Sequence, residues 1–254
     1  MATAAAELFD LTGKVALITG GSRGLGREMA LAFARAGADI VVASRKLDAC
    51  AATAADIEAL GRRALPYACH VGQWAELDGL VEAAYRHFGK VDVLVNNAGM
   101  SPLYPSLVEV NEALWDKMLA VNLKGPFRLS ALVGSRMAAA AGGSIINISS
   151  VAAIRPTPVE TPYGAAKAGL NALTIAFARE YGPKVRVNCI MAGPFLTDIS
   201  KAWDLGAVTQ RIEALAALKR PGRPSEIVGA ALYFASAASS FTTGAILQVD
   251  GGLP

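Results

Sequence analysis

The sequence predicts an α/β fold, namely a doubly wound, seven-stranded parallel sheet with helices on both faces. Short runs rich in β-branched residues alternate with segments of helical length along the whole chain. These runs, among them VALIT, IVVA and IINI, are almost continuously apolar. Continuous apolar runs are typical of strands that helices cover on both faces. No linker or repeat divides the chain, so we expect a single domain over residues 1–254.

Seven segments are expected to form the strands, and they are separated by stretches of helical pattern. In chain order they are Lys14–Gly20, Asp39–Ser44, Ala64–Val71, Val91–Asn96, Ser144–Ser149, Val185–Met191 and Ala245–Val249. An amphipathic helix is expected over Glu28–Ala36 after the first strand. Thr161 and Pro162 resemble an N-cap and first turn, and Pro224 marks another helix start. Residues 194–224, an irregular stretch flanked by prolines, are a candidate substrate lid.

The composition excludes several classes of protein. Hydrophobic residues make up 53% and charged residues 18% of the 254 positions, which argues against disorder. A net charge of +3 without a run of basic residues gives no support for nucleic-acid binding. Cys50, Cys69 and Cys189 are odd in number and widely spaced, so neither a disulfide framework nor a metal site is expected. Reduced, buried thiols fit a cytoplasmic enzyme, and the N-terminus does not resemble a secretory signal.

One uncharged stretch, Ile227–Val249, is long enough to span a bilayer. Its second half is interrupted by serine, threonine and glycine residues, which a membrane helix of marginal length does not favour. We therefore expect a buried helix, a turn and a core strand here, and no membrane partner.

A glycine-rich turn follows the first expected strand and opens directly into a helix. Such a turn lets the backbone approach a pyrophosphate, and the positive end of the helix favours its charge. The alternative is a purely structural turn, because a glycine pattern alone is weak evidence. Its position between a strand and a helix favours dinucleotide binding of the Rossmann type, through Gly20, Ser22, Arg23, Gly24, Leu25 and Gly26.

The end of the second expected strand indicates which dinucleotide is bound. NAD sites usually carry an acidic residue here, whereas this chain has Ser44 followed by Arg45. Arg45, assisted by Arg23, could pair with a 2′-phosphate through charge-assisted hydrogen bonds. NADP(H) is therefore the preferred cofactor, and NAD(H) is the alternative if both arginines are ordinary surface residues.

A tyrosine and a lysine stand four residues apart on an expected helix, so Tyr163 and Lys167 share one face. A tyrosine normally titrates near pKa ~10, and a neighbouring ammonium favours its ionised form. The pair is therefore suited to exchanging a proton with an alcohol or carbonyl oxygen. Ser150 follows the fifth strand at the edge where open α/β sheets bind ligands, and its hydroxyl could hold that oxygen.

Several motifs occur in the order found in the short-chain dehydrogenase/reductase family, which the chain resembles over nearly its whole length. They are TGGSRGLG at 19–26, NNAG at 96–99, Asn122, NISS at 147–150 and YGAAK at 163–167. The resemblance implies a catalytic tetrad of Asn122, Ser150, Tyr163 and Lys167, in which the asparagine positions a water for proton relay. Ser150 precedes Tyr163 by thirteen residues, so it is the second serine of NISS that matches the family's catalytic one.

The resemblance also implies further cofactor contacts and an assembly. It places Asn97, Ala98 and Gly99 along the adenine and ribose side, with His70 and Val71 near the adenine. It passes the backbone of Gly193, Pro194, Phe195 and Thr197 over the nicotinamide. His70 departs from the aspartate or asparagine that is frequent in the family, and Ala192 from the usual proline. The C-terminal strand and tail resemble those at the family's subunit contacts, which implies a homotetramer.

The function expected is an oxidoreductase that transfers a hydride between NADP(H) and a small carbonyl or secondary alcohol. The chain resembles 3-oxoacyl-carrier reductases and polyol or gluconate dehydrogenases most. Three alternatives remain: a catalytically silent NADP(H) sensor on the same fold, a sugar-nucleotide epimerase, and an NAD-dependent polyol or gluconate dehydrogenase. The segments expected to line the substrate site carry no basic cluster that would demand a phosphorylated or carrier-bound substrate.

Overall fold

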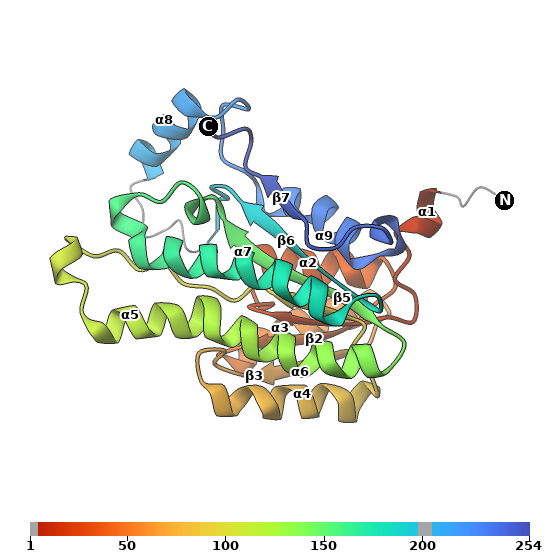
Figure 1. Ribbon diagram of the computed structural model, residues 1–254. Helices are drawn as coiled ribbons and strands as arrows, with labels where there is room; N and C mark the ends of the chain where they lie inside the picture. The colour runs from red at the N-terminus through yellow and green to blue at the C-terminus, as the bar shows by residue number, and fades with distance from the viewer. Residues whose placement is uncertain (1–4, 198–204) are drawn as a thin grey trace.

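The computed structural model describes residues 5–197 and 205–254, and a seven-stranded sheet lies at its centre (Figure 1). The strand order is β3-β2-β1-β4-β5-β6-β7, and every neighbouring pair is parallel. The strands are β1 (Val15–Thr19), β2 (Asp39–Ser44), β3 (Ala64–Ala68), β4 (Val93–Asn96), β5 (Gly143–Ser150), β6 (Val185–Ala192) and β7 (Ile246–Val249). The predicted fold class is confirmed, and each strand lies within two or three residues of its expected position.

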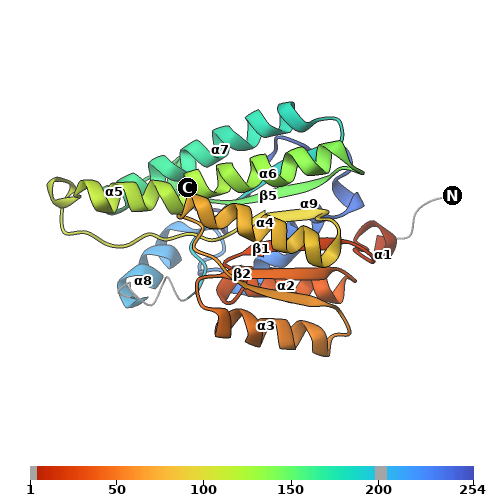
Figure 2. The same cartoon turned by 90° about the horizontal axis from the view of Figure 1, so that it is seen from below.

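Helices cover both faces of the sheet (Figures 1 and 2). One face carries α2 (Gly24–Arg35), α3 (Leu47–Ala59) and α9 (Val228–Ala235), and the other carries α4 (Trp74–Phe88), α6 (Gly125–Ala139) and α7 (Thr161–Tyr181). The described helices also include α1 (Ala5–Leu8), α5 (Glu112–Leu119) and α8 (Leu205–Leu215), a π turn at Ala120–Lys124 and 3₁₀ turns at Leu107–Glu109, Val151–Ala153, Pro158–Glu160, Pro224–Ile227 and Ala237–Ser239.

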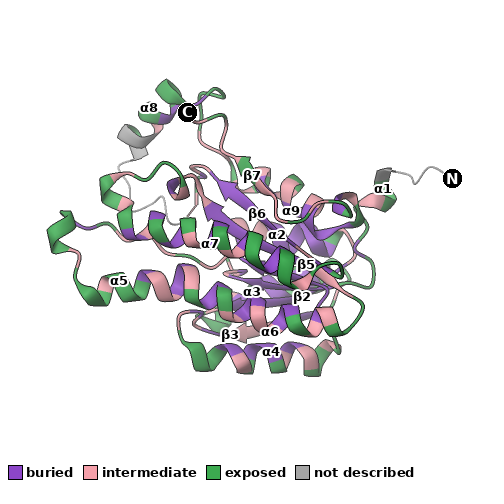
Figure 3. Ribbon diagram, viewed as in Figure 1, coloured by how far each residue is buried: buried purple, intermediate pink, exposed green. Residues whose placement is uncertain are grey.

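Two separate hydrophobic cores lie on the two faces of the sheet. Figure 3 shows that the strands between them are largely buried. Successive residues of a strand point to opposite faces, so Leu17 belongs to one core and Ile18 to the other. Both side chains are completely buried. This is the reason why the strand sequences are continuously apolar, as the sequence pattern predicted.

The chain reverses its winding between β1 and β4, because β2 and β3 extend the sheet on one side of β1 and β4 to β7 extend it on the other. The loops that follow β1 and β4 therefore diverge to opposite faces at the carboxyl edge of the sheet. In open α/β sheets this switch point forms the crevice that binds ligands.

Some expected boundaries were wrong. The β3 strand ends at Ala68 rather than Val71, because the backbone and ring of His70 turn back to accept hydrogen bonds from the amides of Gln73 and Gly72. Helix α7 has Glu160 rather than Thr161 at its N-cap position. Helix α2 begins at Gly24 rather than Glu28, since the glycine turn leads into it without a linker.

Residues 227–249, which are long enough to span a bilayer, and the candidate lid both contain regular structure within the described part of the chain. Residues 227–249 form a short helix, a turn and strand β7, as predicted. No helix within residues 5–197 and 205–254 combines the length and apolar character needed to cross a bilayer. The candidate lid, 194–224, is less irregular than expected because it contains α8. Its residues 198–204 lie outside the described part of the chain.

Candidate active site

The turn between β1 and α2 can be made only by glycine at its key positions. Gly20 and Gly24 have φ values of 65° and 53°, a region that other residues rarely adopt. A Cβ atom on Gly26 would lie 2.3 Å from the carbonyl oxygen of Gly20. Arg23 at the N-cap supplies no side-chain hydrogen bond to the first turn of α2. The amide groups of that turn therefore remain available for an anion, and no Cβ atom blocks its approach.

Residues after β4 hold this turn in place. The hydroxyl of Thr19 accepts hydrogen bonds from the backbone amides of Asn97 and Ala98, both at 3.1 Å. The side-chain amide of Asn97 donates to the carbonyl oxygen of Thr19 at 2.9 Å. These hydrogen bonds join the ends of β1 and β4 at the switch point. Asn97 therefore holds the glycine turn in place by hydrogen bonds within the protein.

The end of β2 carries polar groups that face the same turn. The hydroxyl of Ser22 donates to that of Ser44 at 2.9 Å, which links the glycine turn to β2. Arg45 follows Ser44 and is exposed, as is Arg23. Arg45 has no ion-pair partner among residues 5–197 and 205–254, so its guanidinium is available to a ligand phosphate.

His70 and Val71 lie in the loop after β3, beside the carboxyl edge of the sheet. The Nδ1 atom of His70 accepts a hydrogen bond from the amide of Gly72 at 3.1 Å, and its own amide donates to Glu76 at 2.7 Å. A neutral imidazole that accepts at Nδ1 carries its proton on Nε2. This position therefore presents a hydrogen-bond donor to its surroundings.

Ser150 and Tyr163 are brought together by the short connection between β5 and α7. Ser150 is the last residue of β5, and Tyr163 lies in the first turn of α7. The hydroxyl of Ser150 accepts a hydrogen bond from the amide of Ala152 at 3.2 Å and lies close enough to the Tyr163 hydroxyl to lower its pKa. The two hydroxyl groups are thus neighbours at the carboxyl edge of the sheet.

Lys167 is one helical turn beyond Tyr163 and points back toward the sheet. Lys167 is only 3% exposed, and its Nζ atom donates to the carbonyl oxygen of Ile148 at 2.8 Å. The same atom lies 5.6 Å from the centre of the Tyr163 ring. Burial lowers the pKa of Lys167 to about 8. The lysine is therefore an ammonium at neutral pH but loses its proton under mildly alkaline conditions.

The pKa of Tyr163 is shifted in the opposite direction from the one that the residue pairing suggested. Burial raises this pKa to about 12, and the negative charge of Glu160 adds to the rise, while the hydrogen bond from Ser150 opposes both. Lys167 is not among the groups that shift this pKa, although its Nζ atom lies 5.6 Å from the ring centre. Tyr163 therefore carries its proton at neutral pH.

Asn122 is completely buried in the π turn between α5 and α6. Its side-chain amide donates to the carbonyl oxygens of Met100 and Met118 at 2.9 and 3.0 Å, and its oxygen accepts from the amide of Met100. A Cβ atom on Gly99 would lie 3.0 Å from that oxygen and 3.7 Å from Nζ of Lys167. The side chain thus fixes the loop after β4 next to Lys167. Single π turns are frequent at functional sites because they displace main-chain carbonyls from the helical ladder.

The segment after β6 crosses toward the glycine turn. Gly193 donates its amide to the carbonyl of Val249 at 2.9 Å, and the amide of Leu196 donates to Gly222 at the same distance. A Cβ atom on Gly24 would lie 3.6 Å from the side chain of Thr197. The segment 193–197 is thereby held next to the glycine turn.

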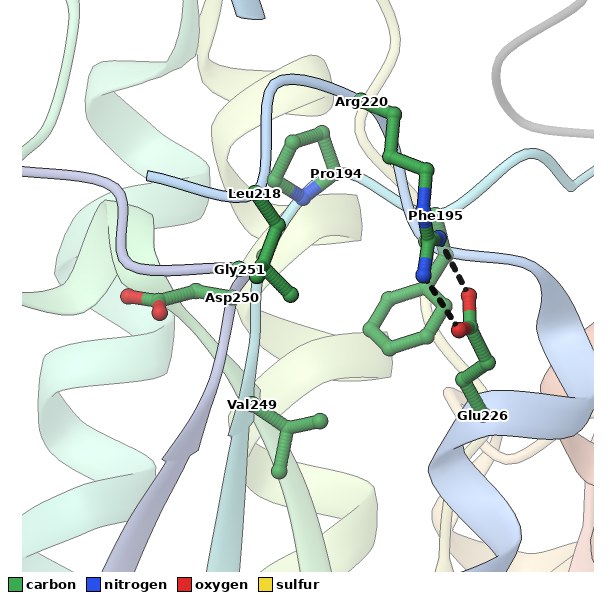
Figure 4. Close-up of a pocket in the computed structure, with 10 residues that line it drawn as sticks. Pro194, Phe195, Leu218, Arg220, Glu226, Val249, Asp250 and Gly251 are labelled. Atoms are coloured by element: carbon green, nitrogen blue, oxygen red, sulfur yellow. Dashed lines mark hydrogen bonds and ion pairs between the residues drawn. The ribbon is translucent and has the colours of Figure 1, made fainter. Parts of the chain in front are cut away.

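A small cavity of about 90 Å³ lies beneath this segment (Figure 4). Phe195 and Val249 line it. A bidentate ion pair between Arg220 and Glu226, with both N–O distances at 2.7 Å, closes one side. The cavity is too small for a substrate and is separated from Ser150 and Tyr163. We interpret it as packing space at the base of the candidate lid.

The structure brings the predicted site residues together at one edge of the sheet, and it adds one that the sequence did not reveal. The hydroxyl of Tyr104 donates to the carbonyl of Pro158 at 2.7 Å and accepts from the amide of Thr161 at 2.8 Å. It thereby joins the loop after β4 to the start of α7. No local pattern marks Tyr104, because its partners are more than fifty residues away.

Within the described ranges, no group of three metal-binding side chains is present.

The chain is similar to known enzymes over nearly its whole length. A family described as enoyl-(acyl carrier protein) reductase matches residues 20–254. The chain is 38% identical to dehydrogenase/reductase SDR family member 4 of Bos taurus over 244 residues, which are 95% of this chain and 88% of the relative. It is 37% identical to D-threitol dehydrogenase of Mycolicibacterium smegmatis over 246 residues, 96% of this chain and 94% of the relative.

Solved structures agree with this similarity. A 7α-hydroxysteroid dehydrogenase in complex with NADH and 7-oxo glycochenodeoxycholic acid superposes with a TM-score of 0.94 at 35% identity, covering 99% of this chain and 98% of the other. An NADPH-dependent 3-quinuclidinone reductase from Rhodotorula rubra gives a TM-score of 0.93 at 30% identity, covering 99% and 95%. These two proteins use different nicotinamide cofactors and different ketones, so similarity alone does not choose between them.

Proposed function

Because the chain belongs to the short-chain dehydrogenase/reductase family, we propose that it interconverts a carbonyl group and a secondary alcohol with NADP(H). The observation that carries this proposal is the grouping of Ser150, Tyr163 and Lys167 at the carboxyl edge of the sheet, next to a turn that admits a pyrophosphate. Members of this family are dehydrogenases and reductases, and this grouping is the chemistry that such a reaction needs.

The residues present suit a phosphorylated dinucleotide. Bound NADPH would supply the hydride. The glycine turn with Ser22 and Leu25 would hold the pyrophosphate, and Arg45 with Arg23 would hold the 2′-phosphate. His70 and Val71 would flank the adenine, and the segment 193–197 would cover the nicotinamide. The exposed guanidinium of Arg45, with no described ion-pair partner, favours NADP(H) over NAD(H).

The chain's own groups divide the work on the substrate oxygen. Ser150 donates a hydrogen bond that holds this oxygen, and Tyr163 gives it a proton during reduction. With its raised pKa, Tyr163 is a proton donor at neutral pH, which suits carbonyl reduction better than alcohol oxidation. The Lys167 ammonium stabilises the tyrosinate that is left. We assign proton resupply to a water held by the backbone carbonyl of Asn122, because both N–H donors of its side chain are used by Met100 and Met118.

Two further features of the proposal concern the molecule as a whole. Residues 194–224 would close over the substrate as a lid. The exposed Phe241 and the edge strand β7 would bury apolar surface in a homotetramer. Three buried cysteines without a disulfide suit the cytoplasmic location that we propose.

The test is the removal of one hydroxyl group. We expect Tyr163→Phe to lower kcat for ketone reduction by roughly 10²–10⁴-fold, the usual contribution of a positioned acid. NADPH oxidation is followed by absorbance, and NADPH binding by fluorescence titration. Tyr181→Phe, on the same helix, is the matched control and should retain full activity.

Turnover that survives in Tyr163→Phe would contradict the assigned acid. A wild-type protein that binds NADPH but turns over none of a broad panel of carbonyl compounds would instead support the sensor alternative. A preference for NADH in both binding and turnover would overturn the role of Arg45.

A further inference from the structure

Two loops flank Ser150 and Tyr163, and we call them the walls: residues 100–110, which follow β4, and residues 151–162, which connect Ser150 to α7. The Tyr104 hydroxyl bonds both Pro158 and Thr161, so the walls are tied to each other. Since residues 151–162 connect Ser150 to Tyr163, a substrate whose carbonyl oxygen lies between these two hydroxyls is next to the walls. Their side chains therefore decide which substrates are accepted.

Several of the large side chains that the walls expose are apolar. Leu103 is 55% exposed, Ile154 52% and Val159 51%. Leu107 and Val108 at the outer end of the first wall are also exposed, as is Leu196 on the segment that crosses from β6. Exposed aliphatic side chains on loops that adjoin the catalytic residues form a surface that gains from contact with an apolar ligand.

The charged side chains of the walls are already engaged within the protein. Arg155 donates to the carbonyl oxygen of Leu253 at 2.9 Å and lies 3.8 Å from Asp250. Glu109 accepts from the hydroxyl of Ser106, and Glu160 accepts from the amide of Thr157. The walls thus offer no uncommitted cation to a carboxylate or phosphate, and Glu160 adds negative charge close to Tyr163.

The hydroxyl groups of the walls are committed as well. Thr157 accepts a hydrogen bond from the backbone at the 3₁₀ turn, and Thr161 donates to the carbonyl of Pro158 at 3.3 Å. Ser106 is used by Glu109. Of the serine and threonine hydroxyls in residues 100–110 and 151–162, Ser101 is the one with no hydrogen bond in the described structure.

From these observations we infer that the substrate is a neutral, largely apolar ketone, not a polyhydroxylated or anionic one. The inference rests on the proposed function and deepens it. A sugar or polyol would lose hydrogen bonds to water and find few wall hydroxyls that can replace them, with Ser101 the one that makes no hydrogen bond in the described structure, which costs binding free energy. A sugar acid or acyl phosphate would meet Glu160 without a compensating cation. An apolar ketone suffers neither loss and buries Leu103, Ile154 and Val159.

The first experiment compares substrates of matched size. With NADPH at saturation, kcat/KM is measured for cyclohexanone and a bulkier alicyclic ketone, for a ketose, and for a 5-keto sugar acid. We expect the alicyclic ketones to exceed the ketose and the sugar acid by at least 100-fold. Binding is measured separately, from the fluorescence of NADPH bound to Tyr163→Phe as each compound is added, so that affinity is obtained without turnover.

The second experiment changes the walls without changing their volume. Leu103→Asn combined with Val159→Thr replaces apolar atoms by polar atoms of similar shape. We expect KM for the alicyclic ketone to rise about tenfold, in the range for loss of one or two apolar contacts, with the Kd of NADPH unchanged. Leu60→Asn, at the exposed end of α3 and 39% exposed, is the control and should leave KM as it is.

The outcomes separate the inference from the proposed function. A higher kcat/KM for the ketose or the sugar acid overturns the inference and leaves the oxidoreductase standing. An unchanged KM in the double variant, together with a change of mass in light scattering, assigns the wall side chains to a subunit contact and also overturns it. If no compound is turned over, the proposed function fails, whereas the binding titration still decides the inference: selective binding of the apolar ketone supports it, and equal or absent binding overturns it.

Discussion

The cofactor side and the substrate side of the site are held together in different ways. On the cofactor side, the glycine turn is fixed by backbone shape and by hydrogen bonds from Thr19 and Asn97 at the ends of two buried strands. On the substrate side, the two walls are loops whose relative position depends on one tyrosine hydroxyl. The cofactor side should therefore tolerate almost no change, and the substrate side should be adjustable by single side chains.

The largest effect is expected from Gly26→Ala. The new Cβ atom would lie 2.3 Å from the Gly20 carbonyl oxygen, so the turn must move. We expect the Kd of NADPH to rise by more than 100-fold and the free energy of unfolding to fall by about 2–4 kcal/mol, as overpacking and backbone displacement usually cause. Fluorescence titration and urea denaturation measure the two. Gly229→Ala, where a Cβ atom would meet open space, is the control. Intact NADPH binding in Gly26→Ala would show that the cofactor side is as adaptable as the walls.

A smaller effect on the same side is expected from Arg45→Ala. Loss of charge-assisted hydrogen bonds to a 2′-phosphate costs about 1.5–3 kcal/mol, so the Kd of NADPH should rise roughly 10–150-fold. The Kd of NADH, which lacks this phosphate, should stay the same. Arg35→Ala, an exposed arginine at the other end of α2, should change neither value. Equal losses for both dinucleotides would mean that Arg45 does not recognise the phosphate.

The pH dependence of reduction is expected to report on Lys167, which lies beside Tyr163 and the loop after β4. Burial lowers its pKa to about 8, so the ammonium is present below that pH and is lost above it. If the ammonium assists Tyr163, kcat/KM for ketone reduction should be level near neutrality and fall about tenfold per pH unit above pH ~8. NADPH titrations over the same range separate this effect from cofactor release. A level profile up to pH 10 would contradict the role given to Lys167.

The smallest effect is expected at the link between the walls. Tyr104→Phe removes the hydroxyl that joins Pro158 to Thr161 and retains the ring. Hydrogen bonds of this kind contribute about 1 kcal/mol, so KM for the ketone should rise roughly 3–10-fold. The Kd of NADPH should not change. A rise in the NADPH Kd as large as the rise in KM would show that the two sides are not independent.

The sequence predicted the cofactor side far better than the substrate side. Strand positions are readable because both faces of each strand are buried, as Leu17 and Ile18 illustrate. The glycine turn is readable because no other residue fits its backbone. Both features depend on residues that are close together in the sequence, so the sequence pattern predicts them directly.

What could not be predicted depends on partners far apart in the chain. The Tyr104 link joins residues more than fifty positions apart, and no periodic pattern encodes it. The π turn around Asn122 displaces backbone carbonyl groups from the regular helical positions, and the spacing of apolar residues does not reveal this. The direction of the Tyr163 pKa shift also required the structure, because burial outweighs a charge that residue spacing placed nearby.

The order of the strands also has a consequence for the time at which the protein can fold. β1 is made first but lies in the interior of the sheet, between β2 and β4. One of its edges stays open until the β4 region is synthesised. The amide of Val15, for example, donates its hydrogen bond to the side chain of Asp92, 77 positions later. During that interval a short apolar strand with free amide and carbonyl groups is available to other chains. The emerging polypeptide is therefore most exposed to aggregation before residue 96 is made, and mutations that slow the pairing of β4 should lower the yield of protein more than its final stability.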